Sequence, residues 1–142
     1  MESSAANSVT KFDCCGNCIA TIIRISLLQP SGVNFISSIE DLFQVGIMQR
    51  DHKSPVQEHM HNRIRREMDR TSEFVYIIDG SCKVRFSCNC NPSDFTFENL
   101  NSGDGIIFHG VGVHGIDFIE PTKLIEVKQG PYIPNQDKRV ID

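Results

Sequence analysis

The chain lacks several features that mark specialised classes of protein. It has no tryptophan among its 142 residues, and no apolar run reaches the ~18 residues that a membrane-spanning helix needs. Acidic residues outnumber basic ones by 18 to 14, so we do not expect the basic surface that nucleic-acid binders carry. The sequence therefore predicts a globular protein with neither a membrane nor a nucleic acid as its partner.

A secretory leader is not expected either. The most apolar stretch, residues 19–28, contains Arg24 and follows an acidic residue and three cysteines instead of a basic segment. We therefore expect a cytoplasmic protein whose six cysteines are reduced thiols. The alternative is a four-thiolate zinc site made by Cys15, Cys18, Cys88 and Cys90.

The length of the chain suits one domain with a hydrophobic core of its own. Residues 1–18 are expected to form a flexible N-terminal tail, because the first thirteen are rich in Ser, Ala and Asn. Residues 19–134 are expected to form the domain, and residues 135–142 a polar C-terminal tail. No long amphipathic helix is predicted.

Apolar residues alternate with polar ones along most of the chain, which is the period of β-strands. This alternation predicts strands near residues 23–28, 43–48, 73–78, 82–88, 95–97, 106–108, 114–118 and 124–128. Asp79-Gly80 is typical of a two-residue hairpin turn between two of them. Short strands separated by turn residues predict an all-β sandwich or barrel.

His59 and His61 are separated by one residue. On an extended strand two such side chains point to the same face, so we expect the two imidazoles to project together as metal ligands from one strand must. Glu73 opens the next apolar run, and His114 lies in a Gly-rich segment. Imidazole and carboxylate donors suit one divalent transition metal, either Fe, Mn, Ni, Cu or Zn.

A polar, basic segment follows the two histidines and is expected to be a loop or a short helical turn. The guanidinium group matches the geometry of phosphate and carboxylate, so its arginines are candidate ligands of an anionic substrate. A solvated surface loop is the alternative. The arginines are Arg63, Arg65, Arg66 and Arg70.

Three further residues are candidate catalytic groups. His109 lies five residues before His114 and is a candidate proton carrier, with an exposed loop histidine as the alternative. Tyr76 and Glu126 are expected to face the interior of the barrel. Core packing is the alternative for Tyr76, and a surface ion pair with Lys128 is the alternative for Glu126.

The candidate metal ligands resemble a motif of the cupin superfamily, whose small β-barrels are jelly rolls. In that motif an HxH pair is followed, after a short spacer, by Glu, six residues and Gly. His59 and His61 match the pair, and Glu73 is followed at the same spacing by Gly80. Eleven residues separate His61 from Glu73, so Glu67 is the alternative carboxylate ligand.

A second cupin motif is also similar to a stretch of this chain. It runs from Gly through five residues to Pro-x-Gly, then two residues and His. Gly103 and His114 match its ends, and His109 stands at the proline position. The resemblance spans residues 42–132 and is greatest to small cupins of sugar and polysaccharide pathways that end in a run like LIEVKQGPY, here residues 124–132.

This resemblance implies a single-domain cupin-like jelly-roll barrel. It implies a metal-dependent isomerase or epimerase that acts on a small anionic sugar or keto acid. Three alternatives stay open: an iron-dependent dioxygenase, a non-catalytic sugar-binding module, and a metal-free structural domain. A homodimer is expected, because small cupins commonly pair through their sheet edges. The implied metal ligands are His59, His61, Glu73 and His114.

Overall fold

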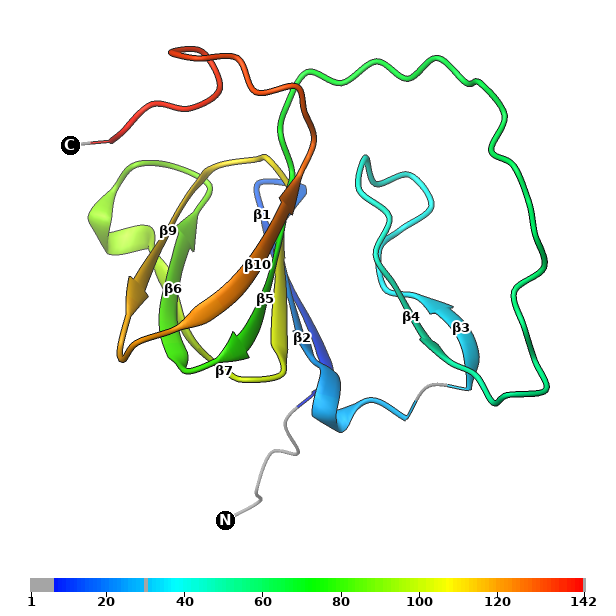
Figure 1. Ribbon diagram of the computed structural model, residues 1–142. Helices are drawn as coiled ribbons and strands as arrows, with labels where there is room; N and C mark the ends of the chain where they lie inside the picture. Colours follow the sequence, from blue (N-terminus) through cyan, green and yellow to red (C-terminus); the bar gives the residue numbers. More distant parts are fainter. Residues whose placement is uncertain (1–6, 30, 142) are drawn as a thin grey trace. The chain divides into compact units, whose positions relative to one another are not determined.

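The computed structural model describes residues 7–29 and 31–141, and the described chain is all-β (Figure 1). The chain divides into two compact units, of which unit 1 is Met1–Leu28 with Arg70–Asp142 and unit 2 is Gln29–Asp69. The expected domain over residues 19–134 is thus interrupted by unit 2. No helix among the described residues is long and apolar enough to cross a membrane.

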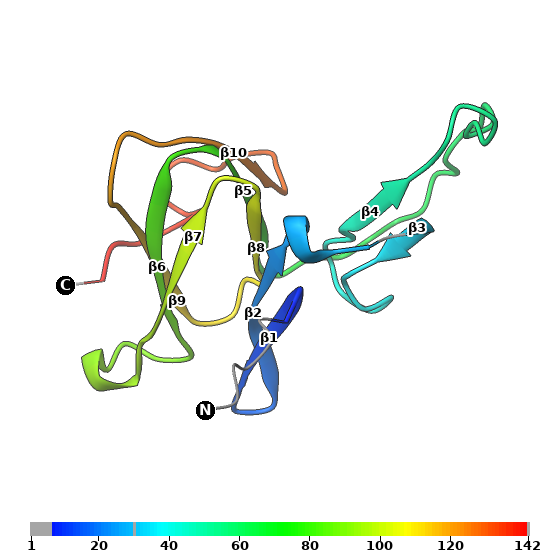
Figure 2. The same cartoon turned by 90° about the horizontal axis from the view of Figure 1, so that it is seen from below.

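Unit 1 contains two antiparallel sheets (Figure 2). The larger has the order β1 (Val9–Cys14), β2 (Asn17–Arg24), β8 (Asp104–Phe108), β5 (Glu73–Asp79) and β10 (Lys123–Lys128). The smaller has the order β7 (Thr96–Asn101), β6 (Ser81–Ser87) and β9 (Val113–Phe118). Two short 3-10 turns are η1 (Ile25–Leu27) and η2 (Pro92–Asp94). The described strands thus form open sheets, and no closed barrel is present among them.

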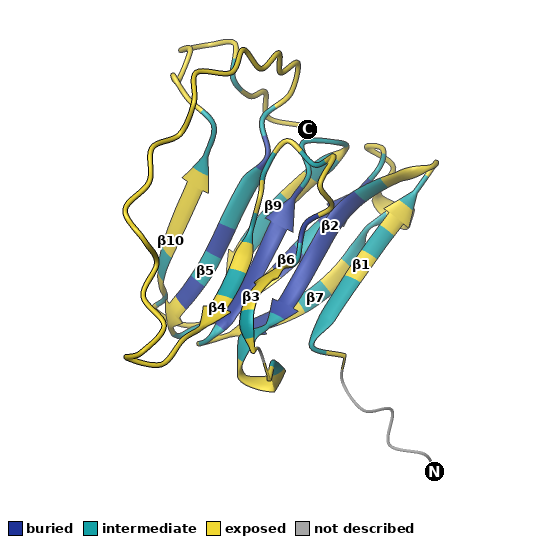
Figure 3. Cartoon of the chain, turned by 90° about the vertical axis from the view of Figure 1, so that its right-hand side faces the viewer, coloured by how far each residue is buried: buried dark blue, intermediate teal, exposed yellow. Residues whose placement is uncertain are grey.

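The core of unit 1 lies between these two sheets, and its buried residues lie mainly on the middle strands (Figure 3). Alternate residues of each strand point inward, such as Val75 and Ile77 on β5. The ring of Phe86 on β6 meets that of Phe108 on β8 edge to face, with centroids 6.4 Å apart. The two sheets are therefore joined by packing of their inner faces, as in a β-sandwich.

The predicted hairpin at Asp79-Gly80 is wrong, although strands lie on both sides of it. β5 pairs with β8 and β10, whereas β6 pairs with β7 and β9, so the chain passes from one sheet to the other at Gly80. A Cβ atom at Gly80 would lie 2.5 Å from the carbonyl oxygen of Pro121. β5 and β6 therefore bury their alternate side chains in the same core, but from opposite sheets.

The amino-terminal part of unit 1 is more regular than the sequence indicated. Residues 9–18, expected to belong to a flexible tail, contain β1 and the start of β2, which form an antiparallel hairpin; residues 1–6 lie outside the described residues. The strand expected at 23–28 ends at Arg24 and continues as η1. Strands over 73–78, 82–88, 95–97, 106–108, 114–118 and 124–128 are confirmed within a few residues.

Unit 2 contains one hairpin, formed by β3 (Gly32–Phe35) and β4 (Gly46–Gln49). Residues 50–72 contain no strand, so the predicted strand carrying His59 and His61 is wrong. Ser37 is the only buried residue among those described in this unit, and Met60 is 88% exposed. A unit this small buries too little apolar surface to hold an extended segment in a sheet.

Candidate functional site

Two of the predicted metal ligands, Glu73 and His114, lie together in unit 1. Glu73 is the first residue of β5 and shares the inward face of Val75. His114 lies on β9, in the other sheet, and shares the face of Ile116. The Nε2 atom of His114 is 3.0 Å from Oε2 of Glu73. The fold therefore joins an imidazole and a carboxylate that are 41 positions apart in the sequence.

Packing and hydrogen bonding fix the orientation of this pair. Phe108 pairs with Glu73 in the β5–β8 ladder, and its ring stacks on the imidazole of His114 with centroids 4.1 Å apart. The hydrogen bond from His114 lowers the pKa of Glu73 below its ordinary value, against the opposing effect of burial. The side chains are 18% exposed for Glu73 and 35% for His114, so solvent and small ligands reach the pair.

Lys128 extends the pair into a cluster of charged side chains. Its Nζ atom lies 3.8 Å from Oε1 of Glu73, 3.3 Å from Oε1 of Glu126 and 3.7 Å from Oδ2 of Asp137. These contacts raise the pKa of Lys128, with the hydrogen bond to Glu126 the largest cause. We call Glu73, His114, Glu126, Lys128 and Asp137 the Glu73–Lys128 cluster. Three carboxylates against one ammonium leave it with net negative charge, which favours a cation.

Unit 2 brings the other two predicted ligands close to each other. The rings of His59 and His61 lie with centroids 5.1 Å apart, and both residues are exposed. Nδ1 of His59 is 2.9 Å from the carbonyl oxygen of Gln57. Because a carbonyl only accepts, Nδ1 is the donor in this contact, which leaves Nε2 as the ring nitrogen directed to other groups. Glu67, the alternative carboxylate, forms an exposed ion pair with Arg65.

The donor types of the four predicted ligands fit a divalent transition metal, because three imidazoles and one carboxylate are common ligands of such ions. Two features of unit 1 oppose this fit. The hydrogen bond to Glu73 occupies Nε2 of His114, and the ammonium of Lys128 competes with a metal for Glu73. Among the described residues, the group of three or more donors close enough to share an ion consists of Cys14, Cys15 and Cys88.

The candidate catalytic residues are separated by the fold. Glu126 belongs to the Glu73–Lys128 cluster, where it forms the ion pair with Lys128 that was the alternative reading. Tyr76 lies between the inward-facing Val75 and Ile77 and therefore points to the opposite face of the sheet. His109 donates or accepts a hydrogen bond with Thr21 Oγ1 at 2.9 Å.

His109 is kept away from the cluster by the same alternation. Thr21 lies between Ala20 and Ile22, which both point into the core, so Thr21 and His109 lie on the outer face of the larger sheet. Phe108, the preceding residue, stacks on His114 on the inner face. The fold therefore does not bring His109 to Glu73 and His114.

The predicted anion-binding arginines are all exposed. Arg63, Arg65 and Arg66 lie in unit 2, and Arg70 is the first residue of the second part of unit 1. The Gly-rich segment approaches Arg70 closely: a Cβ atom on Gly110 would lie 3.0 Å from Cγ of Arg70 and 2.6 Å from the carbonyl oxygen of Thr71. Glycine is required at position 110, because a Cβ atom there would overlap this backbone.

A surface groove lies at the other end of β8 from the cluster. Its lining includes Arg24, Phe97 and Asp104. Arg24 donates to Asp104 at 2.6 Å and to the carbonyl oxygen of Asn99 at 2.9 Å, so the buried carboxylate there is satisfied by a structural ion pair. None of the residues predicted to form a site lines this groove.

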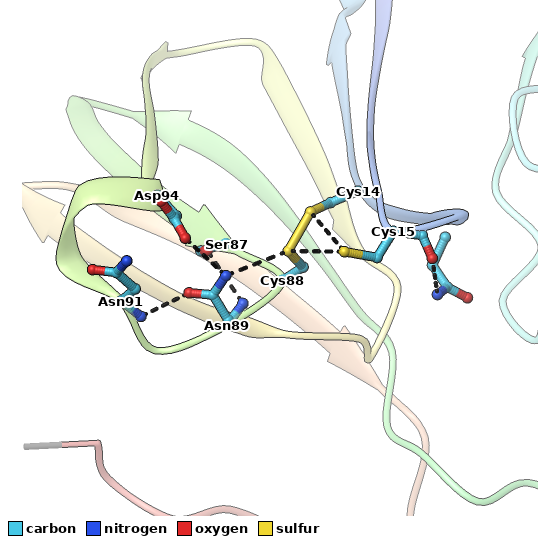
Figure 4. The surroundings of a disulfide bond; sticks show 8 residues. Cys14, Cys15, Ser87, Cys88, Asn89, Asn91 and Asp94 are labelled. Carbon is cyan, nitrogen blue, oxygen red and sulfur yellow. Dashed lines mark hydrogen bonds between the residues drawn. A yellow bond between two sulfur atoms is a disulfide. The ribbon is translucent and has the colours of Figure 1, made fainter.

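The cysteines differ from the expectation of reduced thiols. Cys14, at the end of β1, forms a disulfide with Cys88, which follows β6 (Figure 4). The thiol of Cys15 lies 3.8 Å from Sγ of Cys88. Cys18 contacts Thr21 instead, and burial raises the pKa of the Cys18 and Cys82 thiols. The structure thus joins the two cysteine clusters of the sequence through Cys14, Cys15 and Cys88, and Cys18 has a different environment.

Sequence reasoning missed two members of the Glu73–Lys128 cluster. Lys128 was noted only as a partner of Glu126, and its closeness to Glu73 follows from the pairing of β10 with β5. Asp137 lies in the expected C-terminal tail, yet its side chain is only 12% exposed. No local pattern marks Asp137, because the residues after β10 have no periodicity that predicts where they pack.

Comparison with known proteins adds no relative. No family model, no curated protein and no solved structure matches this chain. The function is therefore inferred from the geometry of the chain itself.

Proposed function

We propose that the chain is a metal-dependent enzyme of the cupin type that isomerises or epimerises a small anionic sugar or keto acid. The observation that carries this proposal is that Glu73 and His114 come from two different sheets to within 3.0 Å of each other, so both could reach one ion once their hydrogen bond is given up. The pair is accessible, and the cluster around it is net negative. Net negative charge of this kind favours a cation, and Glu73 and His114 would hold it where it could attract an anionic substrate.

The proposed ligands are His59, His61, Glu73 and His114. The contact of His59 Nδ1 with the carbonyl oxygen of Gln57 supports its part, because it orients the ring and leaves Nε2 as the nitrogen that could bind an ion. The lowered pKa of Glu73 supports its part, because a ligating carboxylate must be ionised.

A bound divalent ion would supply a Lewis acid that polarises a carbonyl or hydroxyl of the substrate. Glu126 is the proposed base that moves the adjacent proton, because it is exposed and held at 3.3 Å by Lys128. Phe108 limits the movement of the His114 ring by stacking on it. Arg63, Arg65, Arg66 and Arg70 are the proposed contacts of the anionic group of the substrate.

A second candidate function is a non-catalytic binding module for a sugar or metabolite. Lys128 favours it, because an ammonium 3.8 Å from Glu73 weakens the binding of a second cation there. If iron is the bound metal, a dioxygenase replaces the isomerase. A homodimer also belongs to the proposal, because β10 is an edge strand of the described sheet and its Ile125 is 49% exposed.

The test is the metal content of the full-length protein purified without a histidine tag. We expect about one divalent ion per chain in wild-type protein whose Cys14–Cys88 disulfide is closed, because one ion is proposed for these four ligands. Glu73→Gln, His114→Gln and His61→Ala should each lower that content. His52→Ala is the matched control, because His52 is an exposed histidine of unit 2 outside the proposed set.

Activity is measured as the uptake of solvent deuterium next to the carbonyl of candidate keto sugars. Exchange that is lost in Glu126→Gln while the ion is retained would support the isomerase. Ligand binding without exchange would support the binding module. A wild type without metal, or metal loss in His52→Ala equal to that in Glu73→Gln, would exclude the proposed site.

A further inference from the structure

The sulfur atoms of Cys14, Cys15 and Cys88 form a compact group outside the Glu73–Lys128 cluster (Figure 4). Cys14 and Cys15 come from the β1–β2 hairpin of the larger sheet, and Cys88 follows β6 of the smaller sheet. All three sulfurs lie within 4.8 Å of one another. Cys15 is exposed and the other two are partly buried, so the group faces solvent on one side.

The turn that carries Cys15 is unusual for its residue type. Cys14 pairs with Asn17, and the two residues between them, Cys15 and Gly16, have φ angles of +52° and +79°. Such a turn favours Asn or Gly at both positions, because a left-handed conformation costs an ordinary residue about 1–2 kcal/mol. The turn therefore holds Cys15 at a position that glycine would occupy at lower cost.

Two of the three distances between the sulfurs match a thiolate metal site, and the third pair, Cys14 and Cys88, is joined by the disulfide that reduction opens. Cys14 and Cys15 are 3.7 Å apart, and Cys15 and Cys88 are 3.8 Å apart. Tetrahedral zinc has Zn–S bonds of about 2.3 Å, which places its sulfur ligands about 3.8 Å apart. Asn89 Nδ2 lies 3.8 Å from Sγ of Cys88 and donates toward it, an outer contact that stabilises a thiolate.

We propose that Cys14, Cys15 and Cys88 bind a zinc ion when they are reduced, and that formation of the Cys14–Cys88 disulfide expels it. The ion is held by three thiolates, with Cys90 or solvent as the fourth ligand. Cys90 follows Cys88 by two residues and is exposed. Cys18 is excluded from the site because its thiol contacts Thr21 and the carbonyl oxygen of Ala20.

The redox step uses a small-molecule disulfide as oxidant. The thiolate of Cys88 attacks it, forms a mixed disulfide and releases one small thiolate. The thiolate of Cys14 then attacks the Cys88 sulfur, closes the protein disulfide and releases the second small thiolate. Two electrons pass from the cysteines to the oxidant, and the zinc ion leaves because two of its ligands are consumed.

The experiment uses full-length protein reduced with a phosphine and titrated anaerobically with Co²⁺, then competed with Zn²⁺. We expect sulfur-to-cobalt charge-transfer absorption, saturating at one ion per site and displaced by Zn²⁺. Cys15→Ser should weaken zinc binding by more than the roughly ten-fold that loss of an outer-shell partner costs, because it removes a direct ligand. Cys18→Ser is the matched control and should leave the spectrum unchanged.

Two further arms complete the test. Cys90→Ser identifies the fourth ligand. The charge-transfer intensity falls in this variant if Cys90 is the fourth ligand, and it stays the same if solvent is. Protein in which glutathione disulfide has closed the Cys14–Cys88 bond should show no charge-transfer band. Its proteolytic digest should contain two peptides joined by a disulfide between Cys14 and Cys88. Equal spectra for wild type and Cys15→Ser, or binding retained by the closed protein, would overturn the proposal. Glu73→Gln should leave the sulfur bands intact, which separates this site from the one proposed above.

Discussion

The contact between Glu73 and His114 predicts a measurable coupling energy between the two residues. In the cycle, Glu73→Gln removes the charge and keeps the shape of the side chain. His114→Phe removes Nε2 and keeps a ring that stacks on Phe108. The double variant completes the cycle, so the energy of their interaction is obtained apart from the cost of each change.

The magnitude follows from the geometry. A hydrogen bond to a charged group contributes about 1.5–3 kcal/mol, and one between neutral groups about 1 kcal/mol. Replacing the carboxylate therefore removes roughly 1–2 kcal/mol. The side chain of His114 is 35% exposed, and solvent screening lowers the expected coupling to about 1 kcal/mol.

The coupling should depend on pH with a defined sign. The pKa of Glu73 is lowered in the folded protein, so its contribution to stability is complete above the ordinary carboxyl value of about 4.3 and is lost as the pH falls through the lowered value. We therefore expect about 1 kcal/mol near pH 6 and a smaller coupling in acid. Urea denaturation of the four proteins measures it.

A coupling of zero near pH 6, with all four proteins folded and their m values equal, would refute the hydrogen bond as a stabilising contact. A coupling that grows in acid would refute the assigned direction of the pKa change. Arg65 and Glu67 provide a control cycle, because their ion pair has side chains 88% and 80% exposed. No measurable coupling is expected for that pair.

Three further predictions concern the rest of the chain. Gly112→Ala should cost about 2–4 kcal/mol of stability, because Gly112 has a φ angle of +83° and its Cβ would overlap the carbonyl oxygen of Ser87. Gly103→Ala is the control and should cost less, because Gly103 has a φ angle of +90° but open space around its Cβ. Equal costs of the two variants in urea denaturation would contradict the role of the overlap. Replacing Cys14 and Cys88 with Ser should remove up to about 4 kcal/mol, the loop-entropy value for the separation of 74 residues, and an unchanged denaturation midpoint would contradict this. Lys128→Met should tighten divalent metal binding about ten-fold if Glu73 is a ligand, because it removes an ammonium 3.8 Å away; weaker binding in calorimetry would exclude Glu73.

Strand positions were largely predictable because alternation of apolar residues depends on local sequence. The runs at 73–78 and 82–88 each place one face in the core, and both are strands. Their pairing was not predictable from that pattern, because alternation shows which face of a strand is buried but does not show which strand lies next to it. The turn signal at Asp79-Gly80 therefore predicted a hairpin where the chain changes sheets.

The candidate site was predictable in part for a similar reason. The motif spacing selected Glu73 and His114, which the fold brings to 3.0 Å. It also predicted a strand at His59 and His61, but residues 50–72 have few apolar side chains to bury and form none. Lys128 and the contact of Cys14 with Cys88 depend on pairings between distant segments, for which a single sequence carries no signal.

The proposed function depends on a metal held by imidazoles and one carboxylate. The most direct measurement is X-ray absorption at the edge of the metal that copurifies with the untagged protein, after the Cys14–Cys88 disulfide is closed so that the thiolates are withdrawn. We expect a first shell of nitrogen and oxygen with the outer scattering of several imidazoles, and we expect that scattering to be reduced in His114→Gln. A sulfur shell, or a spectrum unchanged in His114→Gln, would contradict it.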